Sequence, residues 1–494
     1  MEFLAYFLCF CVAFFILRLK WKTRSTSKLP PGPKPLPIIE NLLDLGNKPH
    51  KSLAAMAKVY GPIMTQKLGR VTVVVVSSSA MAKEVLQTND HFLCDKAIPD
   101  SLIAHNHNEV GLPWILVSPL WRKYRKICNN TLFAGKIMDV NENLRRRKVE
   151  ELVEIVRKSA SKGEVVDVGI LAFTTTLNLL SNTIFSVDLA DPKSELARQF
   201  KKYMHGYLEE AGNPNLSDYF PVLRKLDIQG MRKRMKIHMG SLLKLLDSMM
   251  KQRMNQQELA PDSVPNNDML HYLLKNEESD AKIDQNQIIH LILILFVAGA
   301  DTTSMTLQWT ITELLRNPEK LAKAQVEIRQ VLGKNKPVEE ADIPRLPYLQ
   351  AVVKEALRLH PPAPLLVPRK AKQEVEIAGF TIPKDAQVLV NAWAIRRDPM
   401  IWMNPESFEP ERFMGSEIDV RGWSFEMIPF GGGRRICPGL SLAMRMMHLM
   451  LGSLISFFDW KVEDGFEMNM DPKFGVIVEM AHPLRAIPVI NCLE

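Results

Sequence analysis

The sequence has few of the residues that fibrous and disulfide-linked proteins need. Its 494 residues include 6 cysteines, 24 glycines and 32 prolines, which excludes a collagen-like rod and a small secreted domain held by disulfide bonds. The mean hydropathy of −0.06 excludes a polytopic membrane protein. Hydrophobic residues make up 46% and charged residues 24% of the chain, which predicts a globular core and excludes a mainly disordered protein. Length alone predicts roughly three domains.

The positive charge is unevenly distributed. The formal net charge is +8, and half of it lies in residues 1–28, where Glu2 is the only acid. A basic excess points to nucleic acid, an anionic membrane surface or an acidic protein as partner. Here the bases follow an uninterrupted apolar run at residues 3–17. As a helix this run is about 22 Å long, somewhat short of a hydrocarbon core of about 30 Å.

The run and its flank predict a transmembrane anchor over residues 3–21. Extension to Trp21 closes most of the length gap if Arg18 and Lys20 reach the headgroups. A cleaved signal peptide is the alternative, but the bases follow the apolar run and no small-residue cleavage pattern is present. The positive-inside rule then places the rest of the chain in the cytosol.

Residues 22–37 predict a basic flank and a proline-rich hinge, whose prolines hold an extended, semi-rigid spacer. A ligand for a proline-binding domain is the other interpretation. Residues 38–494 alternate long helical patterns with short β-branched runs, such as 71–76 and 387–390, which predicts a mainly α fold with small β-sheets. The polar residues 261–287 predict a loop-rich interval.

A helix longer than usual is predicted over residues 284–316, where Asn317-Pro318 ends it. Residues 291–297 are apolar on every face, and polar residues 301–303 then follow Gly299. This pattern allows a kink at which threonine hydroxyls bond carbonyls one turn earlier. It equally allows a site that needs room beside the backbone, together with an acid and a hydroxyl that pass protons.

Residues 430–439, Phe-Gly-Gly-Gly-Arg-Arg-Ile-Cys-Pro-Gly, place Cys437 on a glycine-rich loop before a helix predicted over 440–460. A helix N-terminus and nearby arginines lower the pKa of a thiol. A phosphate-binding loop would need Lys-Ser/Thr after its last glycine, and a zinc site would need further cysteine or histidine ligands nearby. The sequence around Cys437 has neither. A nucleophilic cysteine stays open on spacing alone.

The pattern Phe-x-x-Gly-x-Arg-x-Cys-x-Gly resembles the haem-thiolate loop of the cytochrome P450 monooxygenases. Further stretches are similar to that family's motifs and follow its order: Trp121 with Arg125, residues 298–303, residues 355–358 (Glu-Ala-Leu-Arg) and residues 410–413 (Pro-Glu-Arg-Phe). The resemblance implies a cytochrome P450 fold with a single large haem domain over 38–494, in place of three domains.

The resemblance also implies a role for each motif residue. Cys437 is expected to be the axial ligand of the iron of haem b, and Thr302 with Asp301 to relay protons to O2. Glu355, Arg358 and Arg412 are expected to form a buried cluster that holds the cysteine loop. The other residues implied in haem or oxygen binding are Arg435, Trp121, Arg125, Arg369, Phe430, Gly431 and Gly299.

Segments that line the substrate pocket in the family are almost entirely apolar here, which implies a lipophilic small molecule. Residues 105–109 and 129–133 resemble the terpenoid-hydroxylating branch of the plant microsomal members. His105 and His107 lack further ligands nearby, which favours pocket or surface residues over a metal site. Glu40, Arg396 and Met480 depart from the branch's usual residues. The implied pocket residues are Leu293, Val297, Ala298, Ala363, Leu365, Leu366, Val476 and Ile477.

The function that the resemblance implies is NADPH- and O2-dependent hydroxylation of a terpenoid, a monoterpenol or a diterpene, at the endoplasmic reticulum membrane. Because no stretch resembles a flavin or nicotinamide domain, NADPH–cytochrome P450 reductase is the expected electron donor. Basic residues at 122–126 and 145–148 offer docking charge for this partner. No nucleic-acid motif is present. The alternatives are a reductase-independent haem-thiolate isomerase or dehydratase of oxygenated lipids, a monooxygenase of phenolic or alkaloid substrates, and a non-enzymatic haem sensor.

Overall fold

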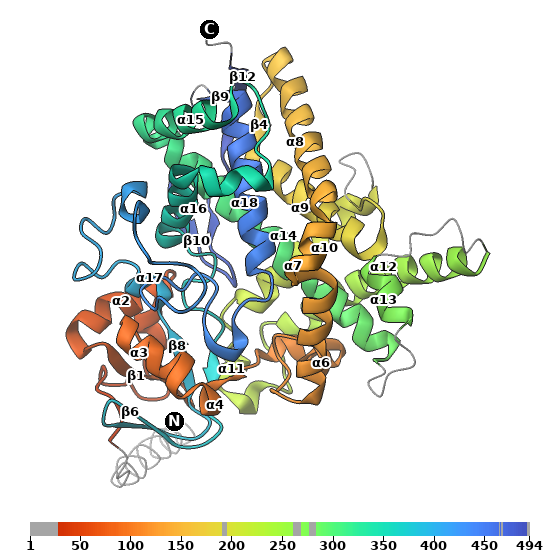
Figure 1. Ribbon diagram of the computed structural model, residues 1–494. Helices are drawn as coiled ribbons and strands as arrows, with labels where there is room; N and C mark the ends of the chain where they lie inside the picture. The colour runs from red at the N-terminus through yellow and green to blue at the C-terminus, as the bar shows by residue number, and fades with distance from the viewer. Residues whose placement is uncertain are drawn as a thin grey trace, which may run out of the picture.

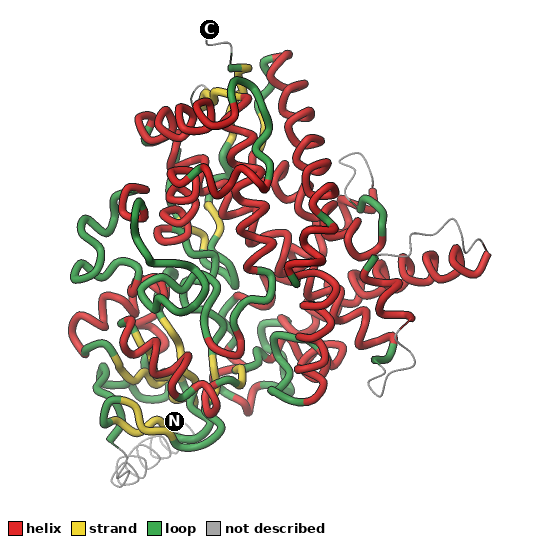
Figure 2. The backbone as a smooth tube through the Cα atoms, in the orientation of Figure 1, coloured by secondary structure: helices red, strands yellow, loops and turns green. Residues whose placement is uncertain are grey.

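The computed structural model describes residues 28–189, 195–259, 268–275, 283–463, 465 and 468–491. The predicted anchor at 3–21 lies outside the described residues, as does the flank up to residue 27. Within them helices predominate, and the strands are short (Figure 2). The strands gather mainly at two opposite ends of the body, and the long helices form the rest (Figure 1). The expected mainly α fold with small sheets is confirmed.

The helices vary from single turns to one of 32 residues. Their bounds are α2 Pro49–Tyr60, α3 Ser79–Lys83, α4 Asp90–Leu93, α5 His107–Val110, α6 Pro119–Cys128, α7 Gly135–Val140, α8 Glu142–Lys162, α9 Val168–Phe185, α10 Glu195–Gly212, α11 Leu216–Tyr219, α12 Met231–Leu259, α13 Met269–Lys275, α14 Gln285–Arg316, α15 Pro318–Leu332, α16 Pro347–Leu359, α17 Ala392–Ile395 and α18 Leu440–Phe457.

The strands of the described residues form four small sheets. The largest has the order β1 (Ile63–Leu68), β2 (Val71–Val76), β8 (Gln387–Val390), β5 (Arg369–Lys370) and β3 (Asp95–Lys96). The others are β4 (Val166–Asp167) with β12 (Arg485–Ile490) and β9 (Phe458–Val462), β10 (Pro472–Lys473) with β11 (Glu479–Met480), and β6 (Val375–Ile377) with β7 (Phe380–Ile382).

The two β-branched runs predicted as strands, 71–76 and 387–390, are confirmed as β2 and β8. They pair in parallel, with Val73 opposite Gln387. On the far side of β8, the strands β5 and β3 pair so that Arg369 lies opposite Lys96. The sheet therefore joins basic residues from two distant parts of the sequence at one edge.

The predicted long helix is confirmed as α14. Asp284 caps its start by accepting a hydrogen bond from the amide of Gln287, whose side chain bonds back to Asp284 in a capping box. Its first half packs with α9, α10 and α12 in one apolar core, and its second half packs with α8, α16 and α18 in another. The helix thus crosses the body and belongs to both cores (Figure 1).

Three helices of the described chain, α9, α14 and α18, are long and apolar enough to span a membrane by length and composition alone. In their most apolar windows, however, 72%, 72% and 56% of the residues are buried inside the protein. Their apolar surfaces therefore serve mainly as core. Helix α18 ends at Phe457, before the expected residue 460, because Phe458 begins β9.

A buried carboxylate joins α16 to the segment before the cysteine loop. Glu355 accepts two hydrogen bonds from Arg358, at 2.7 and 2.8 Å, and a third from Arg412 at 3.3 Å. Its oxygen also accepts the backbone amide of Glu409. Arg358 in turn donates to the carbonyls of residues 396, 405 and 407. The structure thus brings the three predicted cluster residues together.

Two of the three departures from the branch have local consequences. Glu40 adopts a left-handed backbone, with φ of +54°, a conformation that glycine takes at lower cost. The buried Arg396 donates to the carbonyls of Leu357 and Ala392 and so ties α16 to α17, while burial lowers its pKa well below the usual value. Met480 is buried against Thr312 of α14.

The buried cluster yields a stability prediction. Glu355→Gln keeps the shape of the side chain but leaves Arg358 buried without a carboxylate, so we expect a loss of about 3–5 kcal/mol in the free energy of unfolding. Glu154→Gln is the matched control, because Glu154 bonds Arg157 with the same spacing but on the exposed surface of α8. The control should lose less than about 1 kcal/mol. Urea denaturation measures both, and equal losses would contradict the role of burial.

Candidate functional site

The cysteine loop is held by a backbone bond and by glycines. The amide of Cys437 donates to the carbonyl of Phe430 at 3.0 Å, which closes the loop. Gly433 has φ of +68°, and a Cβ there would lie 2.0 Å from the carbonyl oxygen of Leu86. Only glycine fits this position. The loop ends at Gly439, where α18 begins.

The side chain of Cys437 opens onto an internal cavity of about 350 Å³. Its walls come from the cysteine loop, α6, α9, α14, α18 and residues 362–369. Most of the predicted site residues line it: Cys437, Arg435, Trp121, Arg125, Arg369, Phe430, Gly431, Gly299, Thr302, Ala298, Ala363 and Leu366.

Four cations line this cavity: Lys96, Arg125, Arg369 and Arg435. The guanidinium groups of Arg125 and Arg435 both lie over the ring of Trp121, at 5.7 and 4.9 Å from its centroid. Arg369 has an ion pair with Asp90 at 2.8 Å.

The other three cations bond backbone carbonyls: Lys96 that of Val367, Arg125 that of Ile436, and Arg435 those of residues 94, 112 and 115. Within the described residues no carboxylate pairs with these three. Burial lowers the pKa of Lys96 well below its usual value and that of Arg435 to about 10. An anion in this cavity would relieve that cost.

The sequence motifs did not include Lys96. It belongs to no recurrent pattern, and it reaches the cavity because β3 pairs with β5 opposite Arg369. That register is a tertiary feature, so only the sheet topology could have revealed it.

The expected low pKa of the Cys437 thiol is wrong for the protein alone. The backbone amides of Gly439 and Leu440 and the charge of Arg125 do favour the thiolate, but burial outweighs them and raises the pKa. Although the thiol faces the cavity, protein surrounds it elsewhere. A bound metal cation would supply the charge that the thiolate needs.

The cavity face of α14 consists of two neighbouring rows, within each of which successive residues are one turn apart: residues 294, 298, 302 and 306, and residues 295, 299 and 303. Leu293 and Val297, expected in the pocket, are instead buried in the apolar core. One residue turns an α-helix by about 100°, so these two point away from the cavity. Ile294 and Leu295 take their place.

The remaining pocket expectations also need correction. Leu365 packs against the apolar residues of β1 and β2. Val476 and Ile477 line a separate cavity of about 40 Å³ beside His205 and Leu208 of α10. Thr176 and Leu180 of α9 and Met446 of α18 contribute to the main cavity instead, because these helices pack on α14 at a distance that no local pattern encodes.

Both interpretations of the polar stretch at residues 298–303 apply in part: Thr302 bonds a carbonyl one turn earlier, and Thr302 and Gly299 also line the cavity. The hydroxyl of Thr302 donates to the carbonyl of Ala298 at 2.8 Å, one turn earlier, while the side chain lines the cavity. A Cβ at Gly299 would lie 2.8 Å from Cδ1 of Leu180. The glycine therefore lets α9 approach α14 closely, in addition to lining the cavity.

Asp301 does not line the cavity. Burial and the neighbouring Glu479 raise its pKa from 3.8 to about 7, and Lys201 of α10 partly opposes this. Burial therefore favours the protonated form of this carboxyl group far above the pH at which an exposed aspartate loses its proton.

The two loop histidines lie apart. His105 is exposed and contacts the carbonyl of Lys236 at 2.9 Å, whereas His107 is buried against His290 of α14. Within the described residues no group of three or more histidine, cysteine or acidic side chains is placed to hold a metal ion.

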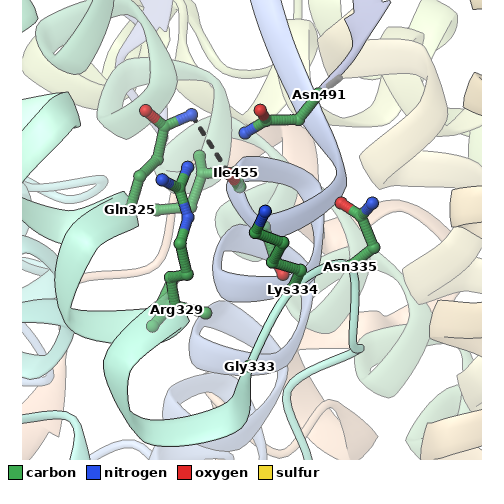
Figure 3. Close-up of a pocket in the computed structure, with 9 residues that line it drawn as sticks. Gln325, Arg329, Gly333, Lys334, Asn335, Ile455 and Asn491 are labelled. Carbon is green, nitrogen blue, oxygen red and sulfur yellow. Dashed lines mark hydrogen bonds between the residues drawn. The ribbon is translucent and has the colours of Figure 1, made fainter. Parts of the chain in front are cut away.

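A further hollow lies on the surface between α15 and α18 (Figure 3). It is lined by polar side chains that include Arg329, Lys334 and Asn491, and the amide of Gln325 donates to the carbonyl of Ile455 there. With a volume of about 20 Å³, it holds about one water molecule.

Comparison with known proteins gives a consistent result. The family described as Cytochrome P450 matches residues 30–485 of the chain. Geraniol 8-hydroxylase of Swertia mussotii is 52% identical over 473 residues, which cover 95% of each chain. Geraniol 8-hydroxylase of Catharanthus roseus is also 52% identical, over 94% of this chain and 95% of its own. Drimenol monooxygenase of Persicaria hydropiper is 46% identical, over 99% and 97%.

The raised pKa of Asp301 predicts how stability changes with pH. The folded state keeps its proton up to about pH 7, whereas the unfolded state loses it near the usual value of 3.8. The carboxyl group's contribution to stability therefore falls as pH rises through that window. We expect Asp301→Asn to gain stability relative to the wild type between pH 5 and pH 8, measured by chemical denaturation. A constant difference across this range would contradict the raised pKa.

Proposed function

Because the chain belongs to the cytochrome P450 family, we propose that it is a membrane-anchored monooxygenase that binds haem b through Cys437 and hydroxylates a terpenoid alcohol. The observation that carries this proposal is the single cavity in which a cysteine, a set of cations and an apolar wall meet. Reductase-independent rearrangement of lipids is disfavoured, because Thr302 places a proton-bearing hydroxyl on the same cavity.

The residues present fit haem. Lys96, Arg125 and Arg435 lack carboxylate partners among the described residues, and two propionates would supply the missing negative charge. Cys437 would hold the iron, and Phe430 and Gly431 line the cavity beside it. Bound haem would supply the activation of O2, with electrons that come ultimately from NADPH.

Two side chains of α14 are proposed to handle protons. The Thr302 hydroxyl can donate a proton into the cavity and regain one, because it is both donor and acceptor. Asp301, with a pKa of about 7, can carry a proton at neutral pH and release it. Since Asp301 lies off the cavity face, water is the proposed link between the two groups.

The substrate class follows from the wall and from the relatives. Leu112, Phe133, Leu180, Ile294 and Val367 surround the space with hydrocarbon, which suits a lipophilic molecule. The relatives named geraniol 8-hydroxylase and drimenol monooxygenase act, by name, on terpenoid alcohols. We extend that class to this chain.

NADPH–cytochrome P450 reductase is the proposed electron donor. Arg122 and Lys126 of α6 are exposed and offer positive charge to an acidic partner. Residues 145–148 are less suited to this role, because the structure pairs each of their side chains with a carboxylate, as it does Arg145 with Glu340.

Location at the endoplasmic reticulum membrane is proposed through the anchor at 3–21. Exposed apolar side chains lie at Ile38 and Leu43 behind the hinge and at Val222 and Leu226 after α11. The two segments meet at the β1–β2 turn, since Glu40 pairs with Leu68 and the amide of Arg70 bonds the carbonyl of residue 219. An exposed apolar surface that includes the segment after the hinge suits contact with lipid.

The ligand assignment predicts a spectrum. Microsomes that contain the wild type should show the far-red-shifted carbon monoxide spectrum of a thiolate-ligated haem, and Cys437→Ala should lose it because no other described cysteine opens onto the cavity. Cys94→Ala, which alters a buried cysteine, is the control and should keep it.

With NADPH and reductase the wild type should oxidise members of a terpenoid alcohol panel. Undiminished oxidation without reductase would overturn the monooxygenase assignment.

Thr302→Ala tests the proton relay. Without the hydroxyl, proton delivery should slow, so that product per NADPH falls at least about tenfold and hydrogen peroxide rises correspondingly. Thr310→Ala is the matched control, because Thr310 makes the same one-turn bond on α14 but lies outside the cavity lining. Unchanged coupling in Thr302→Ala would refute the relay.

A further inference from the structure

A second buried carboxylate, that of Asp90, bonds the cysteine loop directly. Its Oδ2 accepts the backbone amide of Arg434 at 3.2 Å, and its Oδ1 accepts Nη1 of Arg369 at 2.8 Å. Asp90 begins α4 and is 5% exposed, and Arg369 is 3% exposed. The Glu355 cluster, in contrast, bonds residues 396–412, which precede the loop. Asp90 therefore contacts the loop where the Glu355 cluster does not.

Arg369 extends this contact to a second point of the loop backbone. Its Nη2 donates to the carbonyl of Gly432 at 3.2 Å, while the side chain also lines the cavity. The carbonyl of Gly432 and the amide of Arg434 belong to the two peptide groups on either side of Gly433. The ion pair of Asp90 with Arg369 thus holds both of these peptide groups.

Close packing adds to these bonds. A Cβ at Gly433 would lie 3.0 Å from Cγ and Oδ1 of Asp90, so the carboxylate packs directly against the loop. The amide of Ile436 donates to the carbonyl of Gly433 at 3.1 Å. The amide of Cys437 donates to the carbonyl of Phe430 at 3.0 Å. Because these two bonds close a short loop on itself, a shift at Gly433 would also move Cys437.

We propose that Asp90 is a positioning residue for Cys437, and that it holds the loop where the sulfur meets the iron. The inference rests on the proposed function, since that function supplies the haem. A carboxylate suits this role because both of its oxygens accept hydrogen bonds, so one group bonds the guanidinium of Arg369 and the amide of Arg434 together. Hydrogen bonds to a charged group are also about twice as strong as those between neutral groups. Loss of either bond would leave the loop freer to move away from the iron.

A buried ion pair that served stability alone would act in the same way wherever it lies. Asp100 provides the comparison, because it is also buried and pairs with an arginine, Arg232 of α12, at 2.6 Å. Within the described part of the chain, neither residue of this pair bonds the cysteine loop. The two pairs therefore separate a general loss of stability from a specific effect on the thiolate.

The experiment uses the haem-loaded full chain, chemically reduced under carbon monoxide. It follows the rate at which the far-red-shifted band converts to the band of haem that has lost its thiolate. Asp90→Asn keeps the size of the side chain, but asparagine has a single acceptor oxygen and cannot accept from both Arg369 and the loop amide. Asp90→Glu keeps two acceptor oxygens and is the conservative variant. Asp100→Asn is the matched control.

We expect this conversion to be about tenfold faster in Asp90→Asn than in the wild type, because a charged hydrogen bond to the loop is lost. Asp90→Glu should convert more slowly than Asp90→Asn. Asp100→Asn should stay within about twofold of the wild-type rate, since it shares no partner with the loop, even where urea denaturation shows that it is less stable.

Equal rates in Asp90→Asn and Asp100→Asn would overturn the positioning role and leave the monooxygenase assignment intact. If Asp90→Asn gives no folded protein, Arg369→Lys takes its place, with Arg232→Lys as its control, because lysine keeps the charge but cannot also bond the carbonyl of Gly432. Arg369→Lys should then convert at least about threefold faster than Arg232→Lys, and equal rates would again overturn the role. If the wild type shows no far-red-shifted band, the ligand assignment itself fails, and the inference falls with it.

Discussion

The position of the cysteine loop depends on the hydrogen bonds that the buried Glu355 carboxylate accepts. This carboxylate is inaccessible to solvent and accepts hydrogen bonds from Arg358, Arg412 and a backbone amide. A carboxylate buried in this way is stable only while its partners stay in place, so the pair is sensitive to the geometry around it. Through Arg358 it also fixes the carbonyls of residues 396, 405 and 407. This segment contains turns and irregular backbone and leads towards the cysteine loop.

The cavity presents the opposite situation, because three of its four cations lack a carboxylate partner among the described residues. The hydrogen bonds of Arg125, Arg435 and Lys96 in this part of the chain go to carbonyls, which offset part of the cost of burying a cation but leave its charge. A protein that kept three such cations for stability alone would gain more from apolar residues. The three cations therefore suit the binding of a dianionic group, and the apolar residues of the same cavity suit an uncharged molecule.

The sequence was sufficient for features that depend on local patterns. The apolar run and the Asn317-Pro318 stop predicted α14, the valine run predicted β2, and the motifs predicted most residues around Cys437. It was insufficient where the rotation of a helix about its axis, or the register between two strands, determines which side chains reach the cavity. Leu293 and Ile294 are both apolar, and only the packing of α9 and α18 determines which faces the cavity. Lys96 required the pairing of β3 with β5.

The thiol pKa shows a different limit. The sequence contains the helix start and the arginines that favour a thiolate, but the cost of burial depends on everything that surrounds Cys437. His107 is similar, since its partner His290 is far away in the sequence and only the fold brings the two rings to 2.7 Å. In each case the missing information was the environment of a correctly identified residue.

The polar residues of α14 lie in two sectors around the helix axis. Counting about 100° per residue from His290, Asp301 lies within about 20° of His290, whereas Thr302 lies about 120° away on the cavity face. Asp301 therefore faces the side where Lys201 of α10 and Glu479 of β11 act on its pKa. In the proposed relay, a proton taken up there passes around the helix to reach the Thr302 hydroxyl. The helix would thus keep a titrating carboxyl group apart from an apolar substrate, while a hydroxyl on the cavity face would transfer protons without adding charge to it.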